Sequence, residues 1–304
     1  MSNSKTQAAF ISLDPIRLPR VLLLGNGILR LCGGIGWNDL LNDLKNRDVA
    51  DEDISDVPFC MKPEVLCDLD AEEIRRKVGA RLADATLCIT PQLEKLLSLD
   101  FDCILTTNYT YEIERVLTNQ KWDDKMRRKC VRVMDGSSHV RHNTNICYEI
   151  PRENKPPVQV WHIHGDALRH TSMILSYYSY ANAIHKLQEY NKRLGDAIFE
   201  HQQEGEALSV RSWLDWFLVG DVYTVGYSFD FAEIDLWWAL ERKKREHASV
   251  GKVHYLNLSN GASAKCKPLL EALGGQYKDI LLEGNSWAEG YDAVIDQIAD
   301  SMLG

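Results

Sequence analysis

VLLLGNGILRLCGGIGW, residues 21–37, begins with an apolar run of strand length and continues into the spaced glycines Gly25, Gly27 and Gly33. This order predicts a buried strand, a tight turn and a short helix. Glycine lets a diphosphate approach a turn closely, and the start of a helix presents free N–H groups to an anion. The stretch fits a nucleotide site, and it equally fits a strand-to-helix turn that uses glycine only for its backbone freedom.

Two better-known phosphate motifs do not match this stretch. A P-loop needs lysine and then serine or threonine after its last glycine, whereas Gly27 is followed by Ile28 and Leu29. The dehydrogenase fingerprint needs a third glycine where Arg30 stands, and an acidic residue at the end of a second strand. Residues 40–56 are acidic with a helical pattern, so no strand is expected there. Hydride-transfer chemistry is therefore disfavoured.

Composition sets the broad class of the protein. The chain has 304 residues, of which 45% are hydrophobic and 26% charged, which suits one large globular domain or a core with a smaller lobe. The formal net charge of -9 gives no general attraction for nucleic-acid phosphates. Residues 125–129 and 242–245 are basic runs, and we interpret both as solvated helix faces. No direct binding of nucleic acid is expected.

Cysteine usage and the lack of export signals predict a cytoplasmic location. The 8 cysteines contain no C-x-x-C pair and lie partly in apolar segments, as expected of free thiols in a reducing compartment. The first residues, MSNSKTQAAF, lack the basic region followed by an apolar region that a signal peptide has. No apolar run of membrane-spanning length follows. A soluble protein without a membrane partner is expected.

Apolar runs separated by helical patterns predict the fold. We expect strands at residues 21–24, 103–107, 158–163, 222–225 and 253–256, short strands at 131–134 and 146–150, and helices after the last strand. This order predicts an α/β fold, a Rossmann-like doubly wound parallel sheet. Residues 1–304 are expected to form a single domain, with helical insertions at about 40–100 and 170–215 forming a smaller lobe.

Helix starts are also predicted. Asn38 is placed to cap a helix that begins at Asp39. Asp230 and Glu233 have the spacing of a capping box, in which Asp230 caps the helix and Glu233 bonds back to it.

Polar or glycine-containing segments follow the expected strands. They are Gly25-Asn26-Gly27, Thr107-Asn108, His164-Gly165, Gly226-Tyr227-Ser228 and Asn257. Parallel sheets of this kind bind ligands beyond the carboxyl ends of their strands. These segments are therefore expected to line one crevice.

The ordered set of motifs resembles the sirtuin family, and more closely its divergent branch of NAD-consuming proteins from bacterial antiviral defence. The resemblance spans most of the chain. It rests on Gly25, Gly27, Gly33 and Trp37 at the family's spacing, on Thr106-Thr107-Asn108-Tyr109, on His164-Gly165, and on Gly226-Tyr227-Ser228-Phe229.

Several positions depart from the family pattern. Asn26, Leu29, Gly36, Asn38 and Thr110 replace residues that are usual there, which affects the expected contacts with ribose and nicotinamide. The chain also lacks the paired C-x-x-C motifs of the zinc module of protein-deacylating sirtuins.

The resemblance implies roles for individual residues. Asn108 and His164 are the expected catalytic residues. The expected cofactor-binding residues are Gly25, Asn26, Gly27, Ile28, Trp37, Thr107, Gly226, Tyr227, Ser228, Asp235 and Asn257. An asparagine amide positions nicotinamide or water without adding charge, and a histidine with a pKa near 6.5 accepts a proton from water or a ribose hydroxyl. From the residues alone, Asn108 also fits a turn, His164 a structural role and Asp230 a helix cap.

A metal site is the weaker interpretation of the histidines. His139, His142, His162 and His164 offer ring nitrogens, but the first two lie in an irregular polar stretch without cysteine or carboxylate support. We expect no metal.

The expected function is an NAD+ hydrolase that releases nicotinamide and ADP-ribose, with NAD as the substrate. The resemblance implies a role as an NAD-depleting effector of antiphage defence. The alternatives are an NAD-dependent protein deacylase or ADP-ribosyltransferase, and a non-catalytic NAD or ADP-ribose sensor. We also expect a homo-oligomer and an activating partner protein encoded nearby, an ATPase or nucleotide-processing protein.

Overall fold

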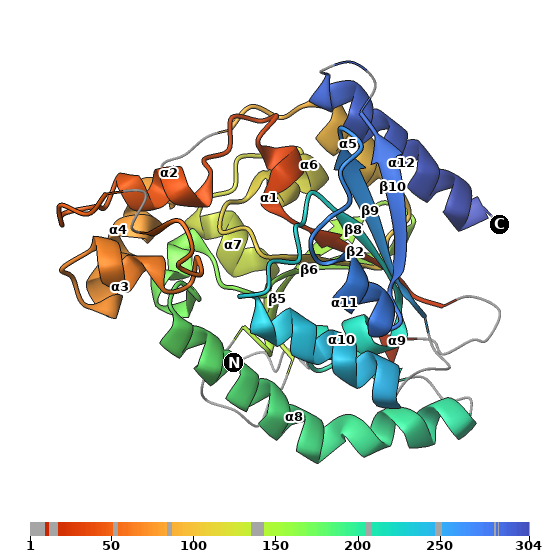
Figure 1. Ribbon diagram of the computed structural model, residues 1–304. Helices are drawn as coiled ribbons and strands as arrows, with labels where there is room; N and C mark the ends of the chain where they lie inside the picture. The colour runs from red at the N-terminus through yellow and green to blue at the C-terminus, as the bar shows by residue number, and fades with distance from the viewer. Residues whose placement is uncertain are drawn as a thin grey trace.

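The computed structural model describes residues 10–11, 18–50, 54–83, 87–134, 143–204, 208–246, 251–282, 284 and 286–303. Among these residues one 8-stranded sheet has the strand order β10-β9-β8-β2-β3-β6-β5-β4 (Figure 1). The strands are β2 (Arg20–Leu24), β3 (Cys103–Thr106), β4 (Val131–Val133), β5 (Ile146–Arg152), β6 (Lys155–His162), β8 (Asp221–Val225), β9 (Val253–Ser259) and β10 (Gln276–Leu281).

The strand order confirms the predicted doubly wound fold. β2 pairs in parallel with both β3 and β8, and chain order runs away from β2 in opposite directions on its two sides. This reversal between β2 and β8 is the topological switch point at which Rossmann-like sheets hold their ligands. The turns after β2 and β8 therefore lie next to each other.

The two edges of the sheet differ from its centre. β5 pairs antiparallel with β6, and β4 antiparallel with β5, so this edge is a hairpin extended by one short strand. At the other edge β10 pairs in parallel with β9. The prediction that helices fill most of the region after residue 256 did not include β10, which carries exposed residues along most of its length.

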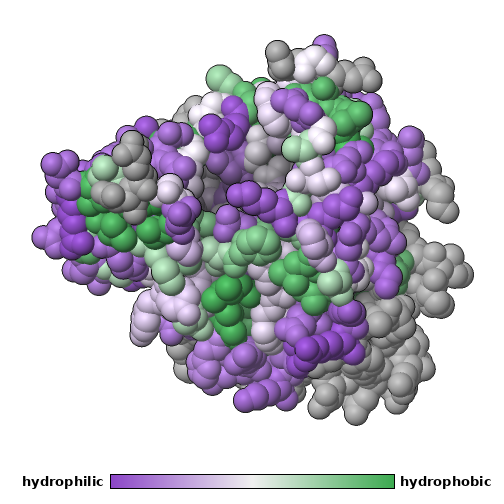
Figure 2. All heavy atoms as spheres, viewed as in Figure 1, coloured by the Kyte–Doolittle hydropathy of each residue, from purple (hydrophilic) through white to green (hydrophobic). Residues whose placement is uncertain are grey.

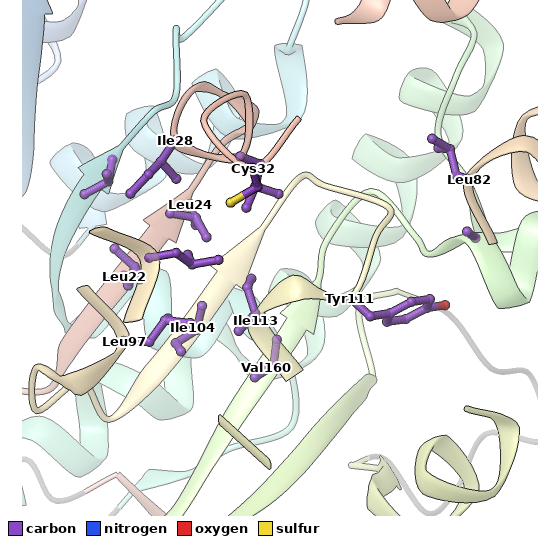
Figure 3. Packing of buried hydrophobic residues seen from close by; sticks show 14 of the residues in the cluster. Leu22, Leu24, Ile28, Cys32, Leu82, Leu97, Ile104, Tyr111, Ile113 and Val160 are labelled. Carbon is purple, nitrogen blue, oxygen red and sulfur yellow. The ribbon is translucent and has the colours of Figure 1, made fainter. Parts of the chain in front are cut away.

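Both faces of the sheet are buried because its central strands are apolar at most positions. In β2, Leu22 and Leu24 belong to one hydrophobic cluster, and Val21 and Leu23 belong to the other. Figure 3 shows part of the first cluster, where Leu22, Leu24, Ile104 and Val160 lie against Ile28 and Ile113. A strand with both faces covered is typical of a parallel sheet between two helix layers.

Different helices supply the two layers. The first cluster includes residues of α1 (Asn26–Leu29), α5 (Pro91–Ser98), α6 (Glu112–Thr118) and α12 (Trp287–Leu303). The second includes residues of α8 (Tyr177–Glu204), α9 (Trp213–Val219), α10 (Ile234–Glu246) and α11 (Lys267–Ala272). α7 (Asp124–Cys130) precedes β4.

A lobe of three helices projects from the sheet between α1 and α5 (Figure 1). It consists of α2 (Trp37–Asn42), α3 (Lys62–Leu66) and α4 (Ala71–Ala83). The Cys88 N–H donates to the Cys32 carbonyl oxygen at 3.1 Å, so the chain leaves the core and returns to it at one point. α5, although inside the predicted insertion of residues 40–100, packs against α6 and α12.

The predicted cap of α2 was wrong. α2 begins at Trp37, and Gly36 occupies the N-cap position without a side-chain hydrogen bond. The helix thus starts two residues before Asp39, and Asn38 lies inside its first turn.

The second predicted insertion contains the longest helix of the described residues. The 3₁₀ helix η2 (Ala167–Ser172) precedes α8, which runs along the lower edge of the molecule in Figure 1. After α8 the short strand β7 (Leu208–Ser209) pairs antiparallel with β1 (Phe10–Ile11).

All 8 cysteines lie among the described residues and are free thiols, as predicted. Within those same residues, no helix combines the length and the apolar composition that a membrane crossing requires.

Lys243, in the basic run of residues 242–245, is buried and does not belong to a solvated helix face. Its ammonium group is buried and donates to the carbonyl oxygens of Phe217, Leu218 and Gly220 at 2.8–3.0 Å, at the carboxyl end of α9. Burial lowers the pKa of Lys243 to about 7, although Asp221 favours the charged form. The group therefore caps α9 from the neighbouring helix.

We expect Lys243→Met to lower the free energy of unfolding by roughly 2–4 kcal/mol, because buried carbonyl oxygens lose their donor. Lys244 provides the control: its ammonium group is exposed and donates to one carbonyl oxygen, that of Ala272, so Lys244→Met should change stability by less than about 0.5 kcal/mol. Urea unfolding followed by circular dichroism measures both. Equal unfolding midpoints for the two variants would contradict the capping role.

Candidate functional site

A cavity of about 1030 Å³ lies beyond the carboxyl ends of β2, β3 and β8. Its walls come from the turn after β2, the segment 107–110 after β3, the turn after β8, and the lobe of α2–α4. Figure 2 shows the surface hollowed between this lobe and the rest of the molecule, with mostly hydrophilic residues around the opening. Its size is at the upper end of the range of roughly 300–1,000 Å³ found for small-molecule sites.

The glycine turn is held tightly against the turn after β8. The Gly25 N–H donates to the Val225 carbonyl at 2.9 Å, and the Gly27 N–H donates to the Gly226 carbonyl at 2.7 Å. A Cβ atom on Gly25 would lie 2.4 Å from the Gly226 oxygen. Gly226 itself has a φ of 63°, which favours glycine.

These bonds correct one expectation for the turn. The N–H groups of Gly25 and Gly27 hold the two turns together, so they are not the free diphosphate donors that the sequence predicts. Gly27 and Asn26 still line the cavity, whereas Gly25 lies behind it. The glycines here allow two backbone segments to approach each other at the switch point.

Hydrogen bonds fix the backbone of Asn108 at both its N–H and its carbonyl oxygen. Its N–H donates to Thr106 Oγ1 at 3.1 Å, and its carbonyl oxygen lies 2.7 Å from His162 Nδ1. His162 Nε2 is in turn 2.8 Å from Glu114 Oε1. Burial opposes the charged ring, but Glu114 and the nearby Asp166 raise the pKa of His162. Asn108 thus lines the cavity on a backbone that a buried ion pair holds in place.

His164 lines the cavity and is paired with Asp235. Its Nε2 lies 3.0 Å from Asp235 Oδ2, and both side chains are buried. Burial opposes the charged ring, yet the charge of Asp235 and its hydrogen bond outweigh this effect and raise the pKa of His164, with a further contribution from Glu233. Asp235 was expected among the residues that bind the cofactor. It instead lies behind His164 and orients its ring.

We expect Asp235→Asn to lower the pKa of His164, because burial then acts without the opposing charge. NMR titration of labelled histidine measures the shift, and the loss of one signal in His164→Gln assigns it among the 9 histidines. Glu114→Gln is the matched control, since it removes the carboxylate that faces His162 instead. An unchanged pKa of His164 in Asp235→Asn would contradict the pairing.

Glu233 also lines the cavity, which the sequence did not predict. Only 8% of the residue is exposed, and the buried Tyr227 side chain is its hydrogen-bonding neighbour. The predicted capping box was wrong: α10 begins at Ile234, so the bond from the Ala232 N–H to Asp230 Oδ1, at 2.9 Å, belongs to the turn before the helix, and Glu233 lines the cavity. Burial raises the pKa of Glu233 to about 7, although His164 opposes the shift.

The sequence analysis also did not predict the charged residues of the cavity wall. Arg30, Arg81 and Lys265 line it together with the acids Asp39 and Asp56. Arg30 occupies the position at which the dehydrogenase fingerprint needs glycine. This replacement of glycine by arginine was the signal in the sequence that could have pointed to Arg30.

An aromatic row connects the lobe to His164. Trp37 and Phe59 meet edge to face at 5.9 Å, Phe59 and Tyr180 at 6.1 Å, and Tyr180 and His164 at 5.3 Å. Trp37 Nε1 also donates to the Phe59 carbonyl at 3.2 Å. This row gives the cavity an apolar wall next to the histidine.

Most of the predicted site residues meet in this cavity. Those that line it are Asn26, Gly27, Trp37, Thr107, Asn108, His164, Gly226, Tyr227 and Ser228. Gly25, Ile28, Asp235 and Asn257 are not in its lining. Ile28 is fully buried in the core, and the Asn257 amide bonds the Ala262 carbonyl and Asp279, which holds the loop after β9.

The part of the chain that the structure describes contains no cluster of three or more metal-ligating side chains. His162 and His164 are both engaged by carboxylates. His139 and His142 lie outside the described residues.

The sheet order and the polar-lined cavity at the switch point define an α/β protein of the Rossmann-like class. The family model of the SIR2-like domain matches residues 102–277, more than half of the chain. The chain therefore belongs to the SIR2-like domain family, whose members are NAD-dependent enzymes. The search of curated proteins found no match.

Proposed function

We propose that the protein is an NAD+ glycohydrolase, which cleaves the bond between nicotinamide and ribose and releases ADP-ribose. The single observation that carries this proposal is that Asn108 and His164, from the ends of two neighbouring strands, line the same cavity at the switch point. Membership of the SIR2-like family supports NAD as the substrate.

The chemistry requires three functions from the site. Cleavage passes through a cationic ribose, so the site must bind the leaving amide, position the ribose and admit a water. The Asn108 amide offers both a donor and an acceptor to nicotinamide or to water. His164, held by Asp235, presents its other ring nitrogen, Nδ1, for the ribose. Arg30 and Lys265 supply positive charge for the diphosphate.

Purified protein incubated with NAD+ tests the proposal. We expect equal amounts of nicotinamide and ADP-ribose, measured by chromatography, without any added peptide. Nicotinamide that appears only with an acyl-lysine or acceptor peptide would instead identify a deacylase or transferase. Binding of NAD+ without turnover, under activating conditions, would identify a sensor.

We also propose that the activity is controlled from outside the catalytic site, by a partner protein or by self-assembly, and that it serves antiphage defence by depleting NAD. A hydrolase of this kind must be kept inactive in a healthy cell. Expression of the chain alone and with the product of its neighbouring gene, with cellular NAD as the readout, tests this control. Equal loss of NAD in both cells would refute it.

A further inference from the structure

The last side chain of β6 reaches the segment that carries Asn108. His162 Nδ1 lies 2.7 Å from the Asn108 carbonyl oxygen. A carbonyl oxygen can only accept a hydrogen bond, so Nδ1 must carry a proton and donate it. β3 ends at Thr106, whose carbonyl oxygen accepts from the Ile163 N–H at 2.9 Å. The imidazole therefore supplies a side-chain donor to Asn108, two residues beyond the end of the strand.

Glu114 of α6 and two aromatic rings hold the other side of this imidazole. His162 Nε2 is 2.8 Å from Glu114 Oε1, and both side chains are buried. The rings of Tyr111 and Tyr148 pack against it, with centroids 5.4 and 5.8 Å from that of the imidazole. Only 2% of His162 is exposed, so we expect no water to take its place as the donor.

The same strand end carries His164 two residues later. The chain after His164 also bonds the Asn108 segment, because the Ala167 N–H donates to the Tyr109 carbonyl oxygen at 3.0 Å. The carbonyl oxygens of two successive residues are thus held by the chain before and after His164. These bonds fix the position of Asn108 relative to His164 in the cavity wall.

We propose that His162, held by Glu114, is a positioning residue for NAD+ cleavage, because it fixes the backbone of Asn108 and thereby places the Asn108 amide against the nicotinamide ribose. The inference rests on the proposed glycohydrolase function. His162 is not in the cavity lining, so it acts on the reaction through Asn108 and not through contact with the substrate. A misplacement of about 1 Å in a group that contacts the reacting atoms can cost about 10²-fold in rate.

Two variants that differ by a single donor test the proposal. Both carry Glu114→Gln, so that neither has a buried carboxylate without a partner. His162→Asn places an amide nitrogen near the position of Nδ1 and keeps the donor, whereas His162→Leu has a similar shape and no donor. We expect kcat for nicotinamide release to be at least about 10-fold lower with His162→Leu than with His162→Asn, and KM for NAD+ to agree within about 3-fold.

The same comparison in Asn108→Ala protein separates positioning from a general effect on the fold. Without the amide no side chain is left to position, so His162→Leu and His162→Asn should then release nicotinamide at rates within about 2-fold of each other. Lys243→Met is the control, because it removes a buried donor to carbonyl oxygens outside the cavity lining. It should lower stability and leave kcat unchanged.

His162→Gln in the Glu114→Gln protein is the second variant if His162→Leu does not fold. Its longer side chain places the amide near the position of Nε2 and leaves the position of Nδ1 without a donor. We expect the same loss of kcat as with His162→Leu.

The outcomes are distinguishable. Equal kcat values for His162→Leu and His162→Asn, or a difference that persists unchanged in Asn108→Ala protein, overturn the inference alone. A wild-type protein that binds NAD+ but releases no nicotinamide under activating conditions overturns the proposed function and the inference with it.

Discussion

His164→Gln and Asn108→Ala proteins are each expected to release nicotinamide from NAD+ about 10³-fold more slowly than the wild type. Both residues line the cavity at adjacent strand ends, where they would contact the ribose and the leaving amide. Glutamine is chosen at position 164 because its amide can still donate to Asp235, so no buried carboxylate is left without a partner. Initial rates of nicotinamide release measure the effect.

His185→Ala is the control for these two variants. His185 is exposed on α8, where it pairs with Glu189, and its replacement should leave the rate unchanged. Thermal unfolding of all three variants should show that the fold is retained. A rate for His164→Gln within a few-fold of wild type would show that the chemistry lies elsewhere.

Gly25→Ala is expected to have the largest effect on the fold around the site. The new methyl group would lie 2.4 Å from the Gly226 oxygen and 2.6 Å from the Tyr227 Cα, and both are backbone atoms that cannot turn away. The turns after β2 and β8 would have to separate at the switch point. We expect a loss of about 3 kcal/mol in the free energy of unfolding and at least about 10-fold weaker NAD+ binding.

The conformation of Gly25 makes this a clean test of close approach. Its φ of -97° is accessible to alanine, so the methyl contact is the main change. Gly261→Ala is the opposite case, because Gly261 has a φ of 96° and nothing within 4 Å of the added atom. It should cost about 1–2 kcal/mol from backbone strain and leave NAD+ binding unchanged. Denaturant unfolding and calorimetric titration compare the two, and equal effects on binding would contradict the switch-point assignment.

The sequence predicted the centre of the sheet because burial leaves a clear signal there. β2, β3 and β8 are apolar at nearly every position, and glycine or a polar residue follows each of them. β10 was missed because an edge strand faces solvent, so Lys278 and Asp279 within it carry no apolar signal. The start of α2 was misplaced because no side chain caps it.

Most of the predicted residues that line the cavity follow the end of a strand. Asn108 and His164 come directly after β3 and β6, so chain order placed them. The pairing of His164 with Asp235 spans 71 residues and depends on how α10 packs, which local patterns do not encode. The inward turn of Glu233 was missed for a different reason, since a helix-start glutamate usually bonds its own backbone.

The hydrogen bond from the Cys88 N–H to the Cys32 carbonyl oxygen joins the two ends of the chain segment that contains the lobe. The described parts of residues 33–87 also contact the rest of the molecule: α4 packs against η2, and the Tyr177 N–H donates to the Cys60 carbonyl oxygen at 2.9 Å. The family match begins only at residue 102. Extra length in such a loop costs little free energy. None of α2, α3 and α4 interrupts a strand of the 8-stranded sheet, so a change of length in this lobe leaves the strand register unchanged. Because the lobe supplies Trp37, Phe59 and Arg81 to the cavity, a change in these residues would alter the shape and charge of the cavity wall without moving β3 or β6, the strands that precede Asn108 and His164.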